Sequence, residues 1–202
     1  MSRGLKMAAA IGLAVMALGA IYLLNRPAGS PRGGQYAFQV GSPGPGEEAP
    51  PITLPSTDGG TFDLSSYRGK TVLLYFQEGL TCQPCWDQLK DIETNIDRFR
   101  AQGIDEIVSI TTDPLDALKQ KVADEHLATP VLSDPNLAAS AIYHANSYGM
   151  MDDSRDGHSF IVVGPDGTIE WRADYGGAPD FTMYLPVSSL IADMQRGLDG
   201  AA

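Results

Sequence analysis

Two cysteines are the residues of this chain best suited to carry chemistry. Cys82 and Cys85 are separated by Gln83 and Pro84, and they directly follow the apolar run 71–76. Two thiols at this spacing can close a short disulfide and pass electrons to or from another thiol or disulfide. A structural cross-link is the weaker interpretation, because so short a loop removes little entropy from the unfolded chain. The spacing therefore favours a redox dithiol, with Cys82 as the nucleophile and Cys85 as the resolving sulfur.

The local pattern places the two cysteines where a helix begins. A buried strand is expected over 71–77, and apolar residues at helical spacing follow the cysteines until Gly103. Pro84 suits a first-turn position, since proline has no N–H and its fixed φ matches a helix. Cys82 would then lie at the helix N-terminus, where free backbone N–H groups and the helix dipole stabilise a thiolate. We expect both sulfur atoms to be open to solvent.

The rest of the pattern predicts further strands and helices around the strand 71–77. Hairpins are expected where Gly-rich turns separate short apolar runs, and helices where apolar residues repeat every three to four positions. The strands are expected at 52–54, 61–64, 104–111, 131–132, 159–163 and 168–171, and the helices at 113–124, 136–143 and 187–198. This order predicts an α/β domain with a mixed central sheet, flanking helices and an N-terminal hairpin.

The first 50 residues differ from the rest and predict a membrane anchor followed by a linker. Residues 7–24 are uncharged and apolar, lie between Arg3 and Arg26, and are just long enough to span a bilayer. A signal peptide cleaved near 17–20 is the alternative. Residues 27–50 are rich in Pro and Gly, as in a linker. The predicted organisation is a transmembrane anchor over 1–26, a linker over 27–50 and a domain over 51–199.

Charge around the apolar segment predicts where the domain lies and what it binds. Positive residues ahead of the segment favour a cytoplasmic N-terminus, which puts the domain on the outer side of the cell membrane. All 25 acidic residues lie at or after Glu47, where only ten of the 14 basic residues lie. Such a surface repels phosphate backbones, so nucleic-acid binding is disfavoured. We expect protein disulfides or dithiols as substrates, a membrane thiol carrier as electron donor and no cofactor.

Several stretches outside the cysteine motif carry a family resemblance. They are Pro51-Ile52-Thr53-Leu54, Gly60-Thr61-Phe62-Asp63-Leu64, Tyr67-Arg68-Gly69-Lys70, 131–135 and 160–169. Together they resemble the alkyl hydroperoxide reductase/thiol-specific antioxidant group, which is peroxiredoxin-like. The resemblance spans about residues 47–197 and implies a thioredoxin-like fold. The tethered layout also resembles that of membrane-anchored thiol-disulfide proteins of the TlpA and ResA kind.

Departures from the family pattern bear on which reaction is expected. Peroxiredoxins normally carry a proline seven residues and a threonine three residues before the reactive cysteine, where this chain has Tyr75 and Gly79. Their later arginine would fall at Gly157, although Arg155 is nearby, and the cis-proline of thioredoxins near that point is also missing. The Cys-x-Pro-Cys motif is retained. We therefore expect an enzyme, a thiol-disulfide oxidoreductase, and keep a thiol peroxidase as an alternative.

His158 supports a third hypothesis, a copper-binding chaperone. Sco-type copper chaperones share this fold and bind the ion through two cysteines and a histidine ahead of a Pro-Asp-Gly turn, and His158 precedes such a turn here. Cys82, Cys85 and His158 would then be the copper ligands, since thiolates and imidazole suit copper. Those chaperones, however, space their cysteines by three residues. Met150 and Met151 offer further soft donors or pack in a loop or the core. A hydrogen bond from His158 to a thiolate or the backbone is the simpler alternative.

Glu78 is a candidate proton acceptor because it lies four residues before Cys82. Burial at the end of the strand would raise the pKa of its carboxyl group. An exposed loop glutamate is the alternative. Glu78, Pro84 and His158 are thus the predicted supporting residues of the dithiol.

Overall fold

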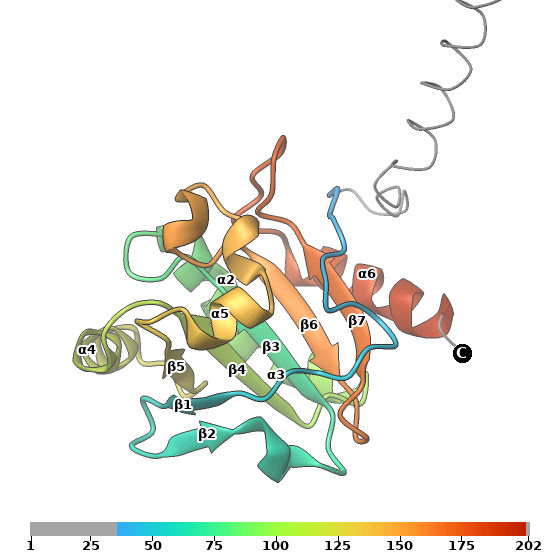
Figure 1. Cartoon of the computed structure of the whole chain (residues 1–202), viewed down its shortest axis with the longest axis horizontal. Helices are drawn as coiled ribbons and strands as arrows, with labels where there is room; N and C mark the ends of the chain where they lie inside the picture. Colours follow the sequence, from blue (N-terminus) through green and yellow to red (C-terminus); the bar gives the residue numbers. More distant parts are fainter. Residues whose placement is uncertain (1–35, 201–202) are drawn as a thin grey trace, which may run out of the picture.

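A mixed sheet of five strands lies at the centre of the structure, a computed structural model that describes residues 36–200 (Figure 1). The strand order is β5-β4-β3-β6-β7. Their bounds are β3 (Val72–Phe76), β4 (Glu106–Thr111), β5 (Val131–Ser133), β6 (Ser159–Val163) and β7 (Ile169–Asp174). β4 is parallel to β3 and β5, whereas β6 is antiparallel to β3 and β7. This order confirms the predicted mixed sheet.

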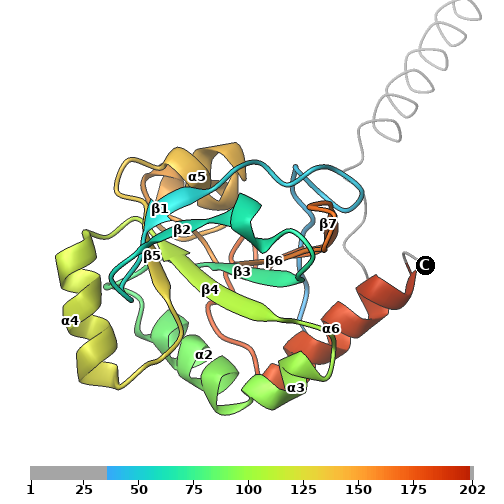
Figure 2. The same cartoon turned by 90° about the horizontal axis from the view of Figure 1, so that it is seen from below.

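Helices and a hairpin cover the two faces of this sheet (Figure 2). The helices are α2 (Gln83–Thr94), α3 (Ile96–Arg100), α4 (Leu115–Glu125), α5 (Ala138–Ile142) and α6 (Val187–Gly200). The short 3-10 helices are η1 (Leu64–Tyr67), η2 (Ala145–Ser147) and η3 (Asp152–Ser154), and the separate hairpin consists of β1 (Thr53–Pro55) and β2 (Thr61–Asp63). The predicted hairpin and flanking helices are therefore confirmed.

The central strand β3 is buried on both faces, which explains its continuous apolar sequence. Leu73 and Tyr75 belong to the core cluster that α2, α3, α4 and α6 complete. Leu74 and Phe76 belong to the cluster on the other face, which α5 and the β1-β2 hairpin complete. β3 is therefore held rigidly, and the loop at its end starts from a fixed position.

The first helical segment is interrupted where the sequence predicts one continuous helix to Gly103. The structure has α2 and α3 instead, with Asn95 between them at φ −108° and ψ 21°. The side-chain amide of Asn95 donates to the Asp91 carbonyl at 2.8 Å. Asparagine competes in this way with the backbone of a helix, which favours a helix end. The break leaves the N-terminus of α2 unaffected.

Residues 38–49, called here the N-terminal segment, pack along β7 although the sequence predicts a linker over 27–50. Phe38 is buried and its ring lies 5.2 Å from that of Tyr175. The backbones of Gln39 and Asp174 exchange two hydrogen bonds at 2.9 and 2.8 Å. The packed part of the chain therefore begins on the N-terminal side of residue 51, because β7 offers this segment backbone partners that composition does not reveal.

A buried ion pair fixes the N-terminal segment to the sheet. The side chains of Arg172 and Asp174 are both 0% exposed and pair through two hydrogen bonds of 2.8 and 3.0 Å. Arg172 also donates to the Pro43 carbonyl at 2.9 Å, and Asp174 accepts the N–H of Gly41 at 2.7 Å. Each charge thus has several partners, which a buried charge requires.

Within residues 36–200, no helix is both long enough and apolar enough to cross a membrane. The predicted anchor over 1–26 lies outside the described residues, as does the alternative cleavage site near 17–20. The prediction of an anchor therefore stays a prediction.

Candidate active site

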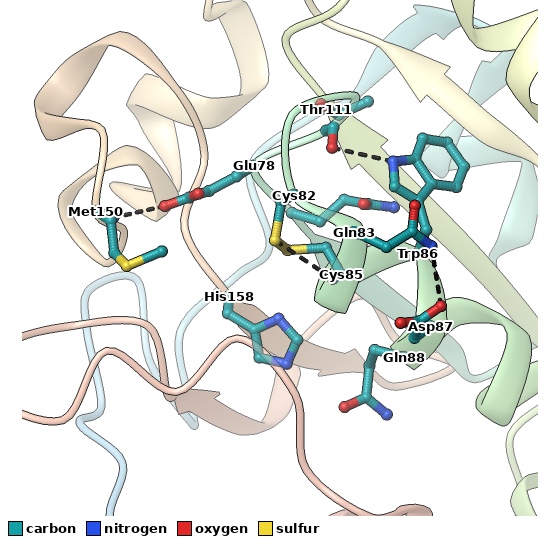
Figure 3. The surroundings of a disulfide bond; sticks show 12 residues. Glu78, Cys82, Gln83, Cys85, Trp86, Asp87, Gln88, Thr111, Met150 and His158 are labelled. Atoms are coloured by element: carbon teal, nitrogen blue, oxygen red, sulfur yellow. Dashed lines mark hydrogen bonds between the residues drawn. A yellow bond between two sulfur atoms is a disulfide. The ribbon is translucent and has the colours of Figure 1, made fainter.

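Cys82 and Cys85 form a disulfide at the N-terminus of α2 (Figure 3). Their Cα atoms are 5.4 Å apart. Cys82 is the N-cap of α2, and its Sγ accepts the N–H of Cys85 at 3.3 Å. Pro84 lies in the first turn, where its missing N–H costs no helical hydrogen bond. The predicted pairing and the predicted position at the start of the helix are both confirmed.

The sulfur atoms are less exposed than the sequence suggests. Cys82 is 5% exposed and Cys85 is 0% exposed. Met183, from the loop between β7 and α6, packs against both cysteines. The expectation that both sulfur atoms are open to solvent was therefore wrong, because a distant loop covers them. Of the two cysteines, only Cys82 keeps any exposed surface.

The loop between β3 and α2 is held by a cluster of polar contacts. Asp113 accepts the N–H of Leu80 at 2.7 Å and pairs with Arg155 at 2.9 Å. Arg155 also donates to the Glu78 carbonyl at 3.0 Å. Within this loop Gly79 has a φ of +84°, and its carbonyl accepts the indole N–H of Trp86 at 3.0 Å. These contacts set the direction in which the chain enters α2 and so position Cys82.

His158 is buried and lies beside the disulfide (Figure 3). It belongs to a hydrogen-bonded chain that ends at Cys85. Its Nδ1 lies 3.0 Å from the hydroxyl of Tyr75, and this hydroxyl donates to the Cys85 carbonyl at 3.2 Å. Burial lowers the pKa of His158 to about 3, so the ring is neutral at neutral pH. Because the Tyr75 hydroxyl donates its hydrogen bond to the Cys85 carbonyl, its oxygen accepts one from His158 Nδ1–H. The neutral ring is therefore protonated at Nδ1 and unprotonated at Nε2. Nε2 is buried and has no hydrogen-bond partner within residues 36–200.

Glu78 is buried, but its carboxylate points away from the disulfide toward Met150 (Figure 3). Its Oε1 accepts the N–H of Met150 at 2.5 Å. The structure therefore gives Glu78 a structural contact that holds the loop before β6. The predicted exchange of a proton with Cys82 has no direct contact to support it.

The geometry offers little to a metal ion. Within the described residues, no group of three or more His, Cys, Asp or Glu side chains is arranged to hold one. Met150 and Met151 lie in a loop, with 55% and 46% of their surface exposed.

Two residues of the site, Tyr75 and Met183, have no sequence motif that marks them. Tyr75 is one of several large side chains in an apolar strand, and only its hydroxyl, placed between His158 and Cys85, marks it. Met183 is separated from Cys85 by almost a hundred residues, so no local pattern connects the two. A polar hydroxyl within a strand buried on both faces is the one hint the sequence offered for Tyr75.

The fold and the helix-capping disulfide define a thioredoxin-like protein with a disulfide-bonded pair of cysteines. The model of the AhpC/TSA family matches residues 45–172, which is more than half of the chain. The chain therefore belongs to the AhpC/TSA family, as the resemblance implied.

Named relatives agree with this assignment. The Mycobacterium tuberculosis protein named "Putative peroxiredoxin Rv2521" is 35% identical over 92 residues, which are 46% of this chain and 58% of that protein. Peroxiredoxin Bcp of Escherichia coli K12 is 32% identical over 89 residues, 44% of this chain and 56% of its own. The matches thus span just over half the length of these relatives. Both names are those of oxidoreductases, which supports the prediction of this enzyme class.

A solved structure shows the same fold. It is titled the solution structure of a putative protein disulfide isomerase from Bacteroides thetaiotaomicron, and it aligns with a TM-score of 0.57 at 22% identity. The alignment covers 80% of this chain and 92% of that one. The predicted thioredoxin-like α/β fold is thereby confirmed.

Proposed function

We propose that this chain is a thiol-disulfide oxidoreductase that cycles between the Cys82–Cys85 disulfide and the dithiol. The disulfide at the N-terminus of α2 is the observation that carries the proposal. Once reduced, Cys82 keeps the N–H of Cys85 beside its sulfur, and the helix N-terminus favours the thiolate. Cys85, in the first turn of α2, is fully buried, which suits a sulfur that reacts only within the protein.

The exchange proceeds in two balanced steps. The Cys82 thiolate attacks one sulfur of a partner disulfide, forms a mixed disulfide and releases the first partner thiolate. Cys85 then gives its proton to the released partner thiolate and attacks the Cys82 sulfur, which closes the Cys82–Cys85 disulfide and releases the second partner thiolate. Two electrons pass to the partner. An external dithiol reverses the steps and restores the reduced form.

Two glycines support disulfide exchange over peroxide reduction. The resemblance implies a threonine at Gly79 and an arginine at Gly157, both for peroxide. A Cβ at Gly79 would overlap Oδ2 of Asp113, and a Cβ at Gly157 would overlap the Tyr148 carbonyl. Neither side chain has room in this fold. Thiol peroxidase activity stays the second candidate, because the two named relatives are peroxiredoxins by name.

Replacing Gly79 with alanine is expected to lower the free energy of unfolding by about 2 to 4 kcal/mol. The φ of +84° penalises any side chain, and the overlap with Asp113 adds a packing cost. Gly103→Ala is the matched control, since Gly103 has a φ of +85° and an added Cβ there meets nothing within 4 Å. Urea unfolding of both variants isolates the packing cost. Equal losses of unfolding free energy in the two variants would show that the loop at Gly79 shifts to accommodate the added Cβ at no cost.

The test of the proposed function is a trapping experiment with two single variants. Cys85→Ser should accumulate mixed disulfides through Cys82, because the resolving sulfur is missing, whereas Cys82→Ser should accumulate none. Non-reducing gels and mass spectrometry of the captured complexes measure both. Equal trapping by the two variants contradicts the assigned roles, and no trapping by either contradicts the proposed function.

The proposal includes a location and partners. The uncharged stretch 7–24 behind positive residues supports a single-pass anchor with the domain on the outer side of the cell membrane. Protein disulfides would be the substrates, and a membrane thiol carrier would supply electrons. Protease added to spheroplasts, in which the cell membrane is intact and accessible, should digest the domain. Protection of the domain would refute this orientation.

A further inference from the structure

We infer that the dithiol selects extended protein segments whose cysteine is flanked by apolar and basic residues. This substrate class rests on the proposed function. The first observation is a groove of about 610 Å³ that begins at the cysteine motif and follows α2. Its walls are formed by Pro84, Asp87, Lys90, Asp91, Thr94 and Tyr184. A segment that reaches Cys82 can therefore continue along the groove.

Exposed apolar side chains gather at the same end of the molecule. The six large ones exposed within residues 36–200 are Val40, Ile142, Met150, Met151, Phe181 and Tyr184. Four of them lie on two loops, 148–157 and 176–186, and Figure 1 shows both loops at the end of the sheet where β3 runs into α2. One loop covers the disulfide through Met183, and the other is bonded to Glu78 through Met150. Apolar side chains of a substrate would find partners on both sides of the disulfide.

Charge on the groove and the two loops is acidic. Asp87 and Asp91 line the groove, and Asp152, Asp153 and Asp180 are exposed on the loops. The cation of the groove, Lys90, pairs with Glu125 at 2.5 Å and with Asp87 at 3.5 Å. Arg155, the arginine of loop 148–157, pairs with Asp113. The uncompensated charge therefore favours a substrate with Lys or Arg and disfavours a small anionic thiol.

Burial of the sulfur atoms favours an extended segment over a rigid folded surface. Cys82 is only 5% exposed and clusters with Met183 of loop 176–186, so a partner sulfur can reach little of its surface. An extended segment is narrow enough to bring its cysteine to Cys82. The residues on either side of that cysteine then contact the loops and the groove. The occupant we commit to is therefore a flexible or unfolded segment of a partner protein.

The experiment compares oxidised peptides of equal length in their reaction with the reduced chain. One peptide carries a cysteine between Phe and Leu with two lysines, the second has glutamates for the lysines, and the third has serines for Phe and Leu. Bis(2-hydroxyethyl) disulfide is the small neutral reference. Stopped-flow fluorescence gives second-order rate constants. We expect the lysine peptide to react about tenfold faster than either other peptide, with a smaller ratio to the glutamate peptide at high salt.

Groove variants test the acidic wall directly. Asp87→Asn and Asp91→Asn keep the hydrogen-bond acceptors but remove the charges, and each should lower the rate ratio of lysine to glutamate peptide about two- to fivefold. Asp97→Asn removes an exposed charge from α3 outside the groove and should leave the ratio unchanged.

The possible results distinguish the two proposals. Equal rates for the three peptides, with reaction of the small disulfide, overturn the substrate class alone. A ratio that Asp87→Asn, Asp91→Asn and Asp97→Asn change equally also overturns it, because the groove then has no special part. If no disulfide oxidises the dithiol, the proposed function fails and the substrate class fails with it.

Discussion

Stability is expected to depend on pH in opposite directions in the variants His158→Asn and Asp156→Asn. In the folded protein, burial lowers the pKa of His158 to about 3, from 6.5 in an unperturbed chain. Below pH 6.5 the unfolded chain therefore binds a proton that the folded protein does not. The stability that neutral His158 contributes is complete above pH 6.5 and is lost as the pH falls, at about 1.4 kcal/mol per pH unit.

Asp156 has the opposite effect, although it lies only two residues away. Burial raises the pKa of its carboxyl group well above 3.8, and the charge of Asp134 adds to this. The folded protein keeps a proton that the unfolded chain releases above pH 3.8. The stability contributed by protonated Asp156 is therefore complete below pH 3.8 and is lost as the pH rises.

Between about pH 4 and 6.5 the two contributions act in opposite directions in the native chain. In His158→Asn only the Asp156 contribution remains, so this variant loses stability as the pH rises. In Asp156→Asn only the His158 contribution remains, so this variant loses stability as the pH falls. Urea unfolding at pH 4.5, 5.5 and 6.5 should give slopes that differ by up to about 2.7 kcal/mol per pH unit. The double variant should return to the native slope. Identical slopes in the two single variants would disprove the burial-driven shifts.

Asp174→Ala is expected to cost about 3 to 5 kcal/mol of the free energy of unfolding. The change leaves the guanidinium of Arg172 charged, fully buried and without its carboxylate partner. It also removes the acceptor of the Gly41 N–H. Because whole domains are stable by about 5 to 15 kcal/mol, this single change removes a large share of the total. Urea unfolding followed by tryptophan fluorescence measures the loss.

Two controls separate the buried charge from general damage. The double variant Arg172→Met with Asp174→Leu removes both charges and should recover most of the loss, since apolar pairs replace buried ion pairs well. Asp97→Ala breaks the exposed pair with Arg100 and should cost less than about 1 kcal/mol. A loss for Asp174→Ala as small as that for Asp97→Ala would mean that water reaches Arg172.

Local patterns predicted the parts of the fold that local forces determine. The strand before Cys82, the start of the helix after it and both hairpins follow from apolar spacing and turn glycines, and the structure places all of them as expected. The pairing of Cys82 with Cys85 follows from a separation of three residues on one helical turn. These features depend on neighbours in the sequence, so composition and spacing are sufficient to find them.

The features that were missed depend on contacts between distant residues. Met183 covers the disulfide from a loop almost a hundred residues away, and the hydroxyl of Tyr75 meets His158 across 83 positions. Glu78 is buried, as one hypothesis required, but the Met150 N–H determines its direction. The break at Asn95 was the local feature that was overlooked, since asparagine is also tolerated inside helices.

Shortening the chain at its N-terminus has a consequence for any assay of the groove. The side chain of Gln39 donates to the Ala178 carbonyl at 2.7 Å, and Arg172, which holds Pro43, lies over the ring of Tyr148 at 5.6 Å. The N-terminal segment thus supports the loop that carries Phe181 as well as the one that carries Met150. A fragment that starts at residue 51 would lose the Gln39 contact and the Pro43 carbonyl that holds Arg172, so its preference among disulfides is expected to differ from that of the longer chain.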